Sequence, residues 1–357
     1  MVEKKNQERD SSIELLRCIA IIMIMAVHAG YYTFGTPTPE SVRTAPVQNF
    51  FYIFYENVNI ICVDVFLIIS GWFGINAKFK SIGGFIFQIL FFSLGGIILG
   101  ALFTDFNFAA GLKTLVLGLF GEDFVSSYII MYILTPVMNS YVKSASAKQM
   151  GTLLVIFYFV IFTSGLLFGN PGLQGKSVLP FCALYMLSRY IRLHSSLPQW
   201  KAKTDFFIWL TIIFGMTLAV WIAAYNGYTD KLGNIALNIS TSYINPAVIA
   251  MSLFVLLFFS RFKFHNRFVN WCGISSFAAV IFHCWVFAPG ESVEGYANFL
   301  RFVSDYNRTM FFVITPFLLI AVFLCAVVID KLRIYLWSII YDKIFAKHLL
   351  KFNLQNK

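Results

Sequence analysis

Long apolar runs dominate the pattern of hydrophobic and polar positions, and they recur along the whole chain. A helix needs about 20 consecutive apolar residues to cross a hydrocarbon core of roughly 30 Å. The pattern therefore predicts an all-α integral membrane protein with about ten transmembrane helices in one bundle. The predicted spans are residues 15–34, 50–75, 82–103, 124–142, 152–169, 177–193, 206–225, 243–260, 272–289 and 309–330. The run at 108–120 is too short to span, so it is expected to lie at the membrane surface or to re-enter the membrane.

The composition agrees with this pattern, because 59% of the 357 residues are apolar and only 12% are charged. This balance excludes an ordinary soluble domain. The spans and their short loops predict one membrane domain over residues 15–330, preceded by a cytosolic leader at 1–14. Residues 331–357 alternate basic and apolar positions, which predicts a basic amphipathic cytosolic tail on the inner leaflet.

Positive charges orient the predicted helices. Successive spans cross the membrane in alternating directions. With that alternation, 21 of the 27 Lys and Arg residues fall on the same side of the membrane as the N-terminus, and 6 fall on the other side. Since basic residues concentrate on the cytosolic side, both termini are expected to be cytosolic. The net charge of +10 then describes a basic cytosolic face, which favours anionic lipid or an anionic cytosolic cofactor as partner and not nucleic acid.

The six cysteines lie within or beside apolar runs and show no CxxC spacing. We interpret them as small packing residues, since neither a disulfide framework nor a zinc site is indicated. No carboxylate or cysteine pair has metal-ligand spacing, and two histidines alone make a poor metal site. The sequence therefore predicts no metal.

Ionisable residues within the first predicted helix are the first sign of a functional site. Arg17 and His28 are eleven residues apart, which places them about 20° from three full turns and about 16 Å apart along a helix. Glu14 precedes Arg17 by three residues, so the two side chains can pair. Two alternatives stay open: Arg17 as an interfacial arginine that extends to water, and His28 as a helix-packing hydrogen-bond donor.

Further ionisable residues occur in other apolar runs. Asp64 lies inside the second run, where an ionised carboxylate costs on the order of 2.5–3.5 kcal/mol on insertion scales. His283 is expected near mid-depth in the ninth run, and Glu56 is expected either at a solvated rim or at an acceptor site. Such residues in a helix bundle face its interior or a water-filled cavity, which predicts a functional site.

These residue types suit acyl transfer to a hydroxyl group. An acceptor alcohol loses its proton as it attacks a thioester, and the imidazole of His28 can accept that proton. Asp64 could orient the ring and stabilise the imidazolium. Arg17, at the predicted cytosolic entrance, has the charge and fork geometry to bind the phosphates of coenzyme A.

Four motifs in order resemble the membrane acyltransferase family 3. They are the R-x10-H arrangement of Arg17 and His28, "VDVFLIISGWF" in the second run, "SSYIIMYILTPVMN" at 126–139 and "GISSFAAVIFH" at 273–283. The resemblance implies a ten-helix domain that takes acyl groups from cytosolic acyl-CoA and acylates carbohydrate beyond the membrane. Carried onto this chain, it implicates the following residues: Arg17, His28, Asp64, Ser70, Gly71, Tyr128 and His283.

The sequence therefore predicts a multi-pass O-acyltransferase, most simply an O-acetyltransferase, of a bacterial cytoplasmic membrane. Acetyl-CoA is the expected donor, and a hydroxyl of a surface polysaccharide or lipid-linked glycan precursor is the expected acceptor. Membrane lipid and glycan-assembly proteins are the other expected partners. Direct transfer with His28 as base is favoured over an acyl-enzyme on Ser70. The alternatives are a polysaccharide or lipid-linked-sugar transporter without acyl chemistry, and an inactive relative that serves as an assembly partner.

Overall fold

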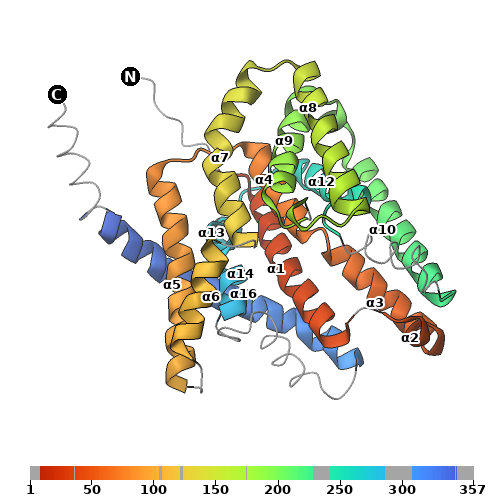
Figure 1. Ribbon diagram of the computed structural model, residues 1–357, viewed down its shortest axis with the longest axis horizontal. Helices are drawn as coiled ribbons and strands as arrows, with labels where there is room; N and C mark the ends of the chain where they lie inside the picture. Colours follow the sequence, from red (N-terminus) through yellow and green to blue (C-terminus); the bar gives the residue numbers. More distant parts are fainter. Residues whose placement is uncertain are drawn as a thin grey trace. The chain divides into compact units, whose positions relative to one another are not determined.

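The computed structural model describes residues 9–35, 37–103, 107–120, 124–173, 175–227, 242–285, 308–341 and 343. Within these ranges the regular elements are all helices, which confirms the all-α prediction (Figure 1). The chain divides into two compact units, each formed by two separate stretches of sequence. Unit 1 comprises residues 1–75 and 116–274, and unit 2 comprises residues 76–115 and 275–357.

Unit 1 contains most of the helices. They are α1 (Ser11–Phe34), α2 (Pro39–Thr44), α3 (Pro46–Asn59), α4 (Cys62–Phe73), α7 (Phe124–Ser144), α8 (Ala147–Val160), α9 (Val178–His194), α10 (Ala202–Tyr225), α12 (Pro246–Ser260) and nearly all of α13 (Arg267–Ser275). The helix α8 continues as a π-helix over Ile161–Leu167. Unit 2 contains α5 (Phe79–Phe103), α14 (Ala278–Trp285) and α16 (Arg308–Ile340), and α6 (Phe108–Phe120) crosses the boundary between the units.

Seven helical segments in the described ranges are long and apolar enough to cross a membrane. They are Ser11–Tyr31, Pro46–Phe73, Phe79–Phe103, Phe124–Ser144, Ala147–Leu167, Ala202–Tyr225 and Met310–Ile340. Each coincides with one of the ten predicted spans.

The other three predicted spans are shorter helices. The span at 177–193 corresponds to α9, which has 17 residues, and the span at 243–260 to α12, which has 15 and rises only about 22 Å. The span at 272–289 is interrupted after Ser275, so it consists of the end of α13 and the short α14. Its last residues, 286–289, lie outside the described ranges.

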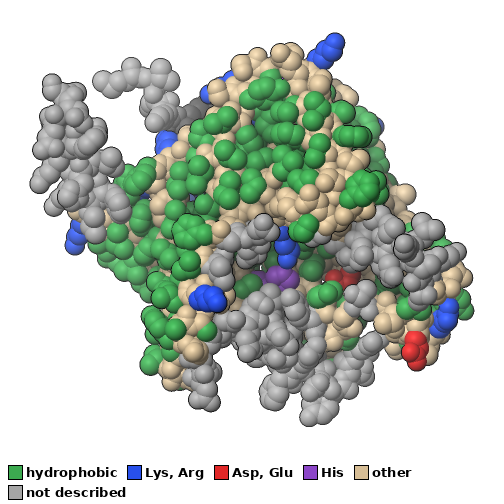
Figure 2. All heavy atoms as spheres, in the orientation of Figure 1, with side chains coloured by type: hydrophobic (Ala, Val, Ile, Leu, Met, Phe, Trp, Pro, Cys, Tyr) green, Lys and Arg blue, Asp and Glu red, His purple; other side chains and the backbone are tan. Residues whose placement is uncertain are grey.

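Large apolar side chains cover much of the outer surface of unit 1. Val137 on α7, Phe159 on α8 and Phe207 on α10 are 69%, 66% and 61% exposed. Figure 2 shows hydrophobic side chains gathered over the part of the visible face formed by α7 and α8, with few charges among them. Because water disfavours such a surface and lipid does not, these helices form a multi-pass membrane protein.

The ends of α1 and α4 follow from the local sequence. Asp10 caps α1, since its carboxylate accepts the backbone N–H of Ser12 at 3.2 Å. Gly74 ends α4 with φ of +76°, a conformation that costs glycine little, and its amide donates to the carbonyls of Ser70 and Gly71. A charged cap and a C-terminal glycine thus fix the two helices that carry most of the predicted site.

The helix α4 lies at the centre of unit 1, where it contacts α1, α9 and α12. Ten of its twelve residues are buried. The predicted span at 50–75 contains α3 and α4, with a turn at Ile60 and Ile61 between them. This turn starts a new helix just before Asp64 and places that residue in the first turn of α4.

Gly71 lets α4 approach α9 closely. A Cβ at this position would overlap the backbone carbonyl oxygen of Tyr185 and lie 2.9 Å from Cβ of Ser188. The Ser188 hydroxyl donates to the carbonyl of Ile68 at 2.6 Å across the same contact. The structure therefore gives the predicted motif residue Gly71 a packing role.

We expect Gly71→Ala to lower the free energy of unfolding by about 1–3 kcal/mol, because the added methyl meets backbone that cannot move aside. The measurement is thermal unfolding of the purified full chain in detergent. Gly215→Ala on α10 is the matched control, since no atom lies within 4 Å of a Cβ there. Equal stability of the two variants would contradict the close α4–α9 contact.

In unit 2, α14 packs against both α5 and α16. A buried ion pair within α16 joins Arg333 Nη2 to Asp330 Oδ1 at 2.7 Å, and Gln88 of α5 donates to the same oxygen at 2.9 Å. The helix α16 continues to Ile340, so residues 331–340 of the predicted tail extend the last span. Residues 344–357 lie outside the described ranges.

Candidate functional site

Glu14 and Arg17 form the ion pair that their spacing predicts. Arg17 Nη1 lies 3.0 Å from Oε2 and 3.2 Å from Oε1 of Glu14, and Arg9 Nη1 lies 3.1 Å from Oε1. The Glu14 side chain is 9% exposed and packs against Gly273 of α13. One carboxylate thus holds two guanidinium groups, so this group at the N-terminal end of α1 keeps an excess positive charge.

Arg17 and His28 lie on one unbroken helix, since α1 is continuous from Ser11 to Phe34. Their separation is therefore about 16 Å along the axis with about 20° between their directions. The helix α3 packs beside the His28 end, where the Tyr55 hydroxyl donates to the carbonyl of Ala26 at 3.0 Å. Arg17 and His28 thus lie on one continuous helix, on a shared face here called the stripe on α1, and the functional role of this stripe stays a prediction.

Glu56, on α3, also lies at the His28 end of α1. Its carboxylate packs against Gly30, where a Cβ would overlap Oε1. That oxygen is buried and has no hydrogen-bond partner among the described residues. Oε1 of Glu56 therefore faces α1, while the residue as a whole is partly exposed, and its role stays a prediction.

Ser70 and Tyr128 meet although they are 58 residues apart. Their hydroxyl oxygens are 3.3 Å apart, and Ser70 Oγ also donates to the carbonyl of Phe66 at 3.1 Å. The Tyr128 ring packs between Phe66 and Phe124, with centroid distances of 5.3 and 6.4 Å. Arg17 is close enough to Tyr128 to interact with it electrostatically. The structure thus brings together residues of three predicted motifs, on α1, α4 and α7.

Asp64 does not make the predicted hydrogen bond to His28. Its side chain is 0% exposed, and neither carboxylate oxygen has a hydrogen-bond partner among the described residues. Instead it lies in the first turn of α4, where the helix dipole favours negative charge. Tyr158 and Tyr243 interact with it electrostatically, and the Tyr158 hydroxyl is itself buried without a partner in the described part of the chain. Asp64 therefore lies near two tyrosines but has no hydrogen bond to either of them.

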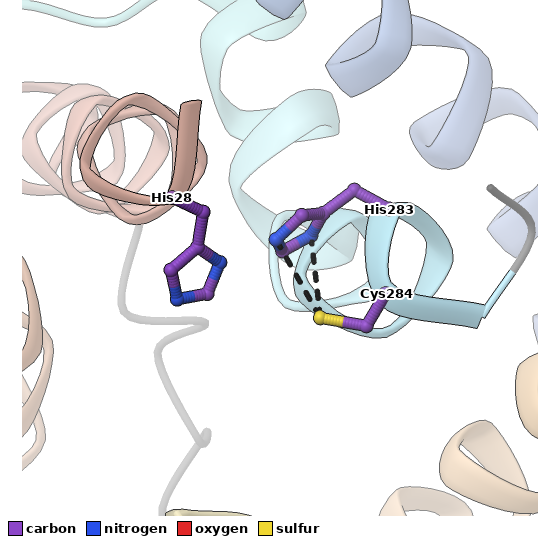
Figure 3. A group of neighbouring side chains, drawn as sticks. All are labelled: His28, His283 and Cys284. Atoms are coloured by element: carbon purple, nitrogen blue, oxygen red, sulfur yellow. Dashed lines mark hydrogen bonds between the residues drawn. The ribbon is translucent and has the colours of Figure 1, made fainter. Parts of the chain in front are cut away.

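His283 is fully buried on α14 in unit 2. Its Nδ1 lies 2.8 Å from the carbonyl oxygen of Ala279, so Nδ1 carries the proton and Nε2 the lone pair. Cys284 Sγ lies 3.5 Å from Nε2 (Figure 3). The sequence predicts only a packing role for Cys284, and the structure adds this contact with the imidazole. Figure 3 also draws His28 on α1 of unit 1.

Tyr185 and Asn139 hold the chain just after the end of α4. Nothing in the sequence indicated these two residues. Tyr185 of α9 donates its hydroxyl to Asn139 Oδ1 at 2.7 Å and accepts the amide of Ile75 at 3.0 Å. Asn139 of α7 donates to the carbonyl of Ile75 at 2.8 Å. This network joins α4, α7 and α9 one turn beyond Ser70.

A cavity of about 1750 Å³ lies within unit 1. Its mostly apolar lining comes from α7, from α8 and its π-helical continuation, from the segment that follows and from the first half of α9. Ser126 and Ser127, which precede Tyr128 in the third motif, contribute polar groups to the wall, as do Lys176 and Tyr243. The cavity therefore adjoins the Ser70–Tyr128 pair through α7.

The apolar spans and the buried ionic groups define a multi-pass membrane protein that holds charged side chains between its helices. The family model described as "Acyltransferase domain" (Acyl_transf_3) matches residues 10–331. The chain therefore belongs to this family of membrane acyltransferases, which confirms the resemblance drawn from the four motifs. No curated protein and no solved structure matches the chain.

Proposed function

We propose that this membrane acyltransferase is an O-acetyltransferase of a bacterial cytoplasmic membrane. It takes acetyl from acetyl-CoA and transfers it to a hydroxyl of a surface polysaccharide or of its lipid-linked precursor. The observation that carries the proposal is the stripe on α1, which joins a half-buried arginine to a histidine about 16 Å further along the helix. Acetyl-CoA carries its phosphates at one end of a flexible arm and its thioester at the other. An enzyme that uses it therefore needs a cation and a base that are separated along that arm.

In the proposed reaction Arg17 binds a phosphate of the donor, with Glu14 fixing the guanidinium. His28 removes the proton from the acceptor hydroxyl as its oxygen attacks the acetyl carbonyl. The new C–O ester bond forms, the thioester C–S bond breaks, and the coenzyme leaves as its thiolate, which takes up a proton. His283 is a second candidate base, because its Nε2 carries the lone pair.

The geometry of Ser70 supports direct transfer over an acyl-enzyme. A serine nucleophile needs a neighbouring base to take its proton. The described partners of the Ser70 hydroxyl are the Phe66 carbonyl and the Tyr128 hydroxyl, and neither is a base at neutral pH. Ser70 and Tyr128 are better placed to bind the substrate through their hydroxyl groups.

We expect Ser70→Ala to retain acetyl transfer, lowered no more than about tenfold, because it removes one neutral hydrogen-bonding group. The measurement is the turnover of radiolabelled acetyl-CoA by the purified full chain. Tyr128→Phe is the matched variant, since it removes the other hydroxyl of the pair and keeps the ring. Complete loss in Ser70→Ala together with a mass increase of one acetyl group on Ser70 in the wild-type chain would contradict direct transfer.

A test of the proposed function supplies radiolabelled acetyl-CoA to membranes that contain this protein and follows the label into extracted glycan and glycolipid. The proposal predicts label in that fraction, with release of free coenzyme A in equal amount. A transporter of lipid-linked sugars would move its substrate without consuming acetyl-CoA. An unlabelled glycan fraction with intact acetyl-CoA would therefore refute the acetyltransferase and favour the transporter.

A further inference from the structure

Two arginines of α9 meet at the C-terminal end of α4. Arg189 and Arg192 are three residues apart on α9, and both donate through Nη1 to the backbone carbonyl of Trp72. The Arg192 guanidinium also lies over the rings of Trp72 and Phe73, with 5.4 Å to each centroid. These contacts hold both charged groups beside the last turn of α4.

The charges of these arginines are not compensated within the described part of the chain. The partly buried arginines Arg17, Arg261 and Arg333 each bind a carboxylate, at 3.0, 2.9 and 2.7 Å. No described carboxylate forms an ion pair with Arg189 or Arg192, and the two are close enough to repel each other.

Capping the end of α4 does not account for this pair. One arginine satisfies the Trp72 carbonyl, and a second adds repulsion without a second acceptor. Nε of Arg189 is buried and has no partner among the described residues, while the side chain of Arg192 is exposed. Arg192 therefore presents its charge to an anion that arrives from outside, and Arg189 adds a second positive charge beside it.

The position of the pair relates it to the proposed reaction. Gly74 ends α4 one turn, about 6 Å, after Ser70, and a Cβ at this position would lie 3.4 Å from Nη1 of Arg189. Ser70 in turn contacts Tyr128, which interacts with Arg17. By the charge bias of the sequence, Arg17, Arg189 and Arg192 all belong to the predicted cytosolic side.

We propose that Arg189 and Arg192 form a second anion subsite, at the end of α4, that binds phosphate groups of the acyl donor. The inference rests on the proposed function and adds to it the place where the nucleotide part of the donor is held. Coenzyme A carries a diphosphate and a separate 3′-phosphate, so Arg17 alone cannot neutralise it. Arg189 and Arg192 add two positive charges to that of Arg17 and so offset more of the donor's charge, and the exposed Phe73 ring beside Arg192 borders the same subsite.

The test compares three donors on the purified full chain in detergent: acetyl-CoA, acetyl-dephospho-CoA and S-acetylpantetheine. We expect Arg189→Gln and Arg192→Gln each to raise the Kd of acetyl-CoA about tenfold, since each removes a charge-assisted contact to phosphate. Their effect on S-acetylpantetheine, which carries no phosphate, should be below twofold. Lysine at both positions should restore most of the affinity because it keeps both charges.

Lys148→Gln is the matched control, because it removes an exposed positive charge from α8 of the same unit. It should leave all three affinities unchanged. Glutamine variants that lose thermal stability but bind acetyl-CoA as tightly as the wild type would overturn the subsite and leave only a helix cap. If Arg17→Ala loses acetyl-CoA affinity and the glutamine variants do not, the subsite is refuted and the proposed function stands. A wild-type chain that binds acetyl-CoA no better than S-acetylpantetheine would refute both.

Discussion

Arg17→Ala is expected to weaken acetyl-CoA binding by about 10- to 100-fold, the loss of one charge-assisted contact of roughly 1.5–3 kcal/mol. The reason is that Arg17 is the half-buried cation at the end of the α1 stripe, and Glu14 fixes its guanidinium at 3.0 Å. The measurement is the Kd of acetyl-CoA on the purified full chain. The fold should persist, because Glu14 keeps Arg9 as a partner and is not left as an unpaired buried carboxylate.

Arg9→Ala is the matched control for this prediction. It removes the other guanidinium bound to Glu14, but the Arg9 side chain is 48% exposed and lies outside α1. We expect its affinity for acetyl-CoA to stay within about threefold of the wild type, as for the loss of a surface ion pair. An equal loss in both variants would mean that Glu14 and the local fold, not Arg17, govern binding.

His28→Ala is expected to lower acetyl transfer by about 10²- to 10⁴-fold, the usual contribution of a general base. Binding of acetyl-CoA should change little, because His28 lies about 16 Å along α1 from Arg17. The measurement is the single-turnover rate of acetyl transfer with the protein in excess over acetyl-CoA. A lower transfer rate with an unchanged Kd of acetyl-CoA would distinguish His28 from Arg17, whose loss is expected to raise that Kd.

His265→Ala is the control, since His265 is an exposed histidine of unit 1 outside the helices. It should transfer acetyl at the wild-type rate. Full activity in His28→Ala would show that another group, with His283 as the first candidate, removes the proton. Loss of acetyl-CoA binding in His28→Ala would instead indicate that the residue holds the helices together.

The helices could be predicted from the sequence because the bilayer imposes their length and apolar character. Two interruptions could not be foreseen. The turn at Ile60 and Ile61 lies between two apolar stretches and contains no glycine or proline, so no helix-breaking residue marks the start of α4. The break at Ser276 and Phe277 lies at the end of a Gly-Ile-Ser-Ser sequence. Because the residues around it are apolar, the mean hydropathy of the whole span does not show the break.

Parts of the site could be predicted where spacing on one helix decides the geometry. The Glu14–Arg17 pair and the common face of Arg17 and His28 follow from helix periodicity alone.

Contacts between helices follow from packing, which one sequence does not reveal. Asp64 therefore lies near Tyr158 and Tyr243 and does not hydrogen-bond His28. In the sequence, Arg189 and Arg192 indicate only the cytosolic end of a weakly apolar span. Their contacts with the end of α4 became visible only in the structure.

The central claim, that this membrane acyltransferase acetylates a surface glycan, is tested most directly by the acetate content of purified surface polysaccharide. The comparison uses cells that contain the protein, cells that lack it and cells that carry His28→Ala at the same membrane level. The account predicts ester-linked acetate in the first and its loss in the other two. Equal acetate in all three would contradict it.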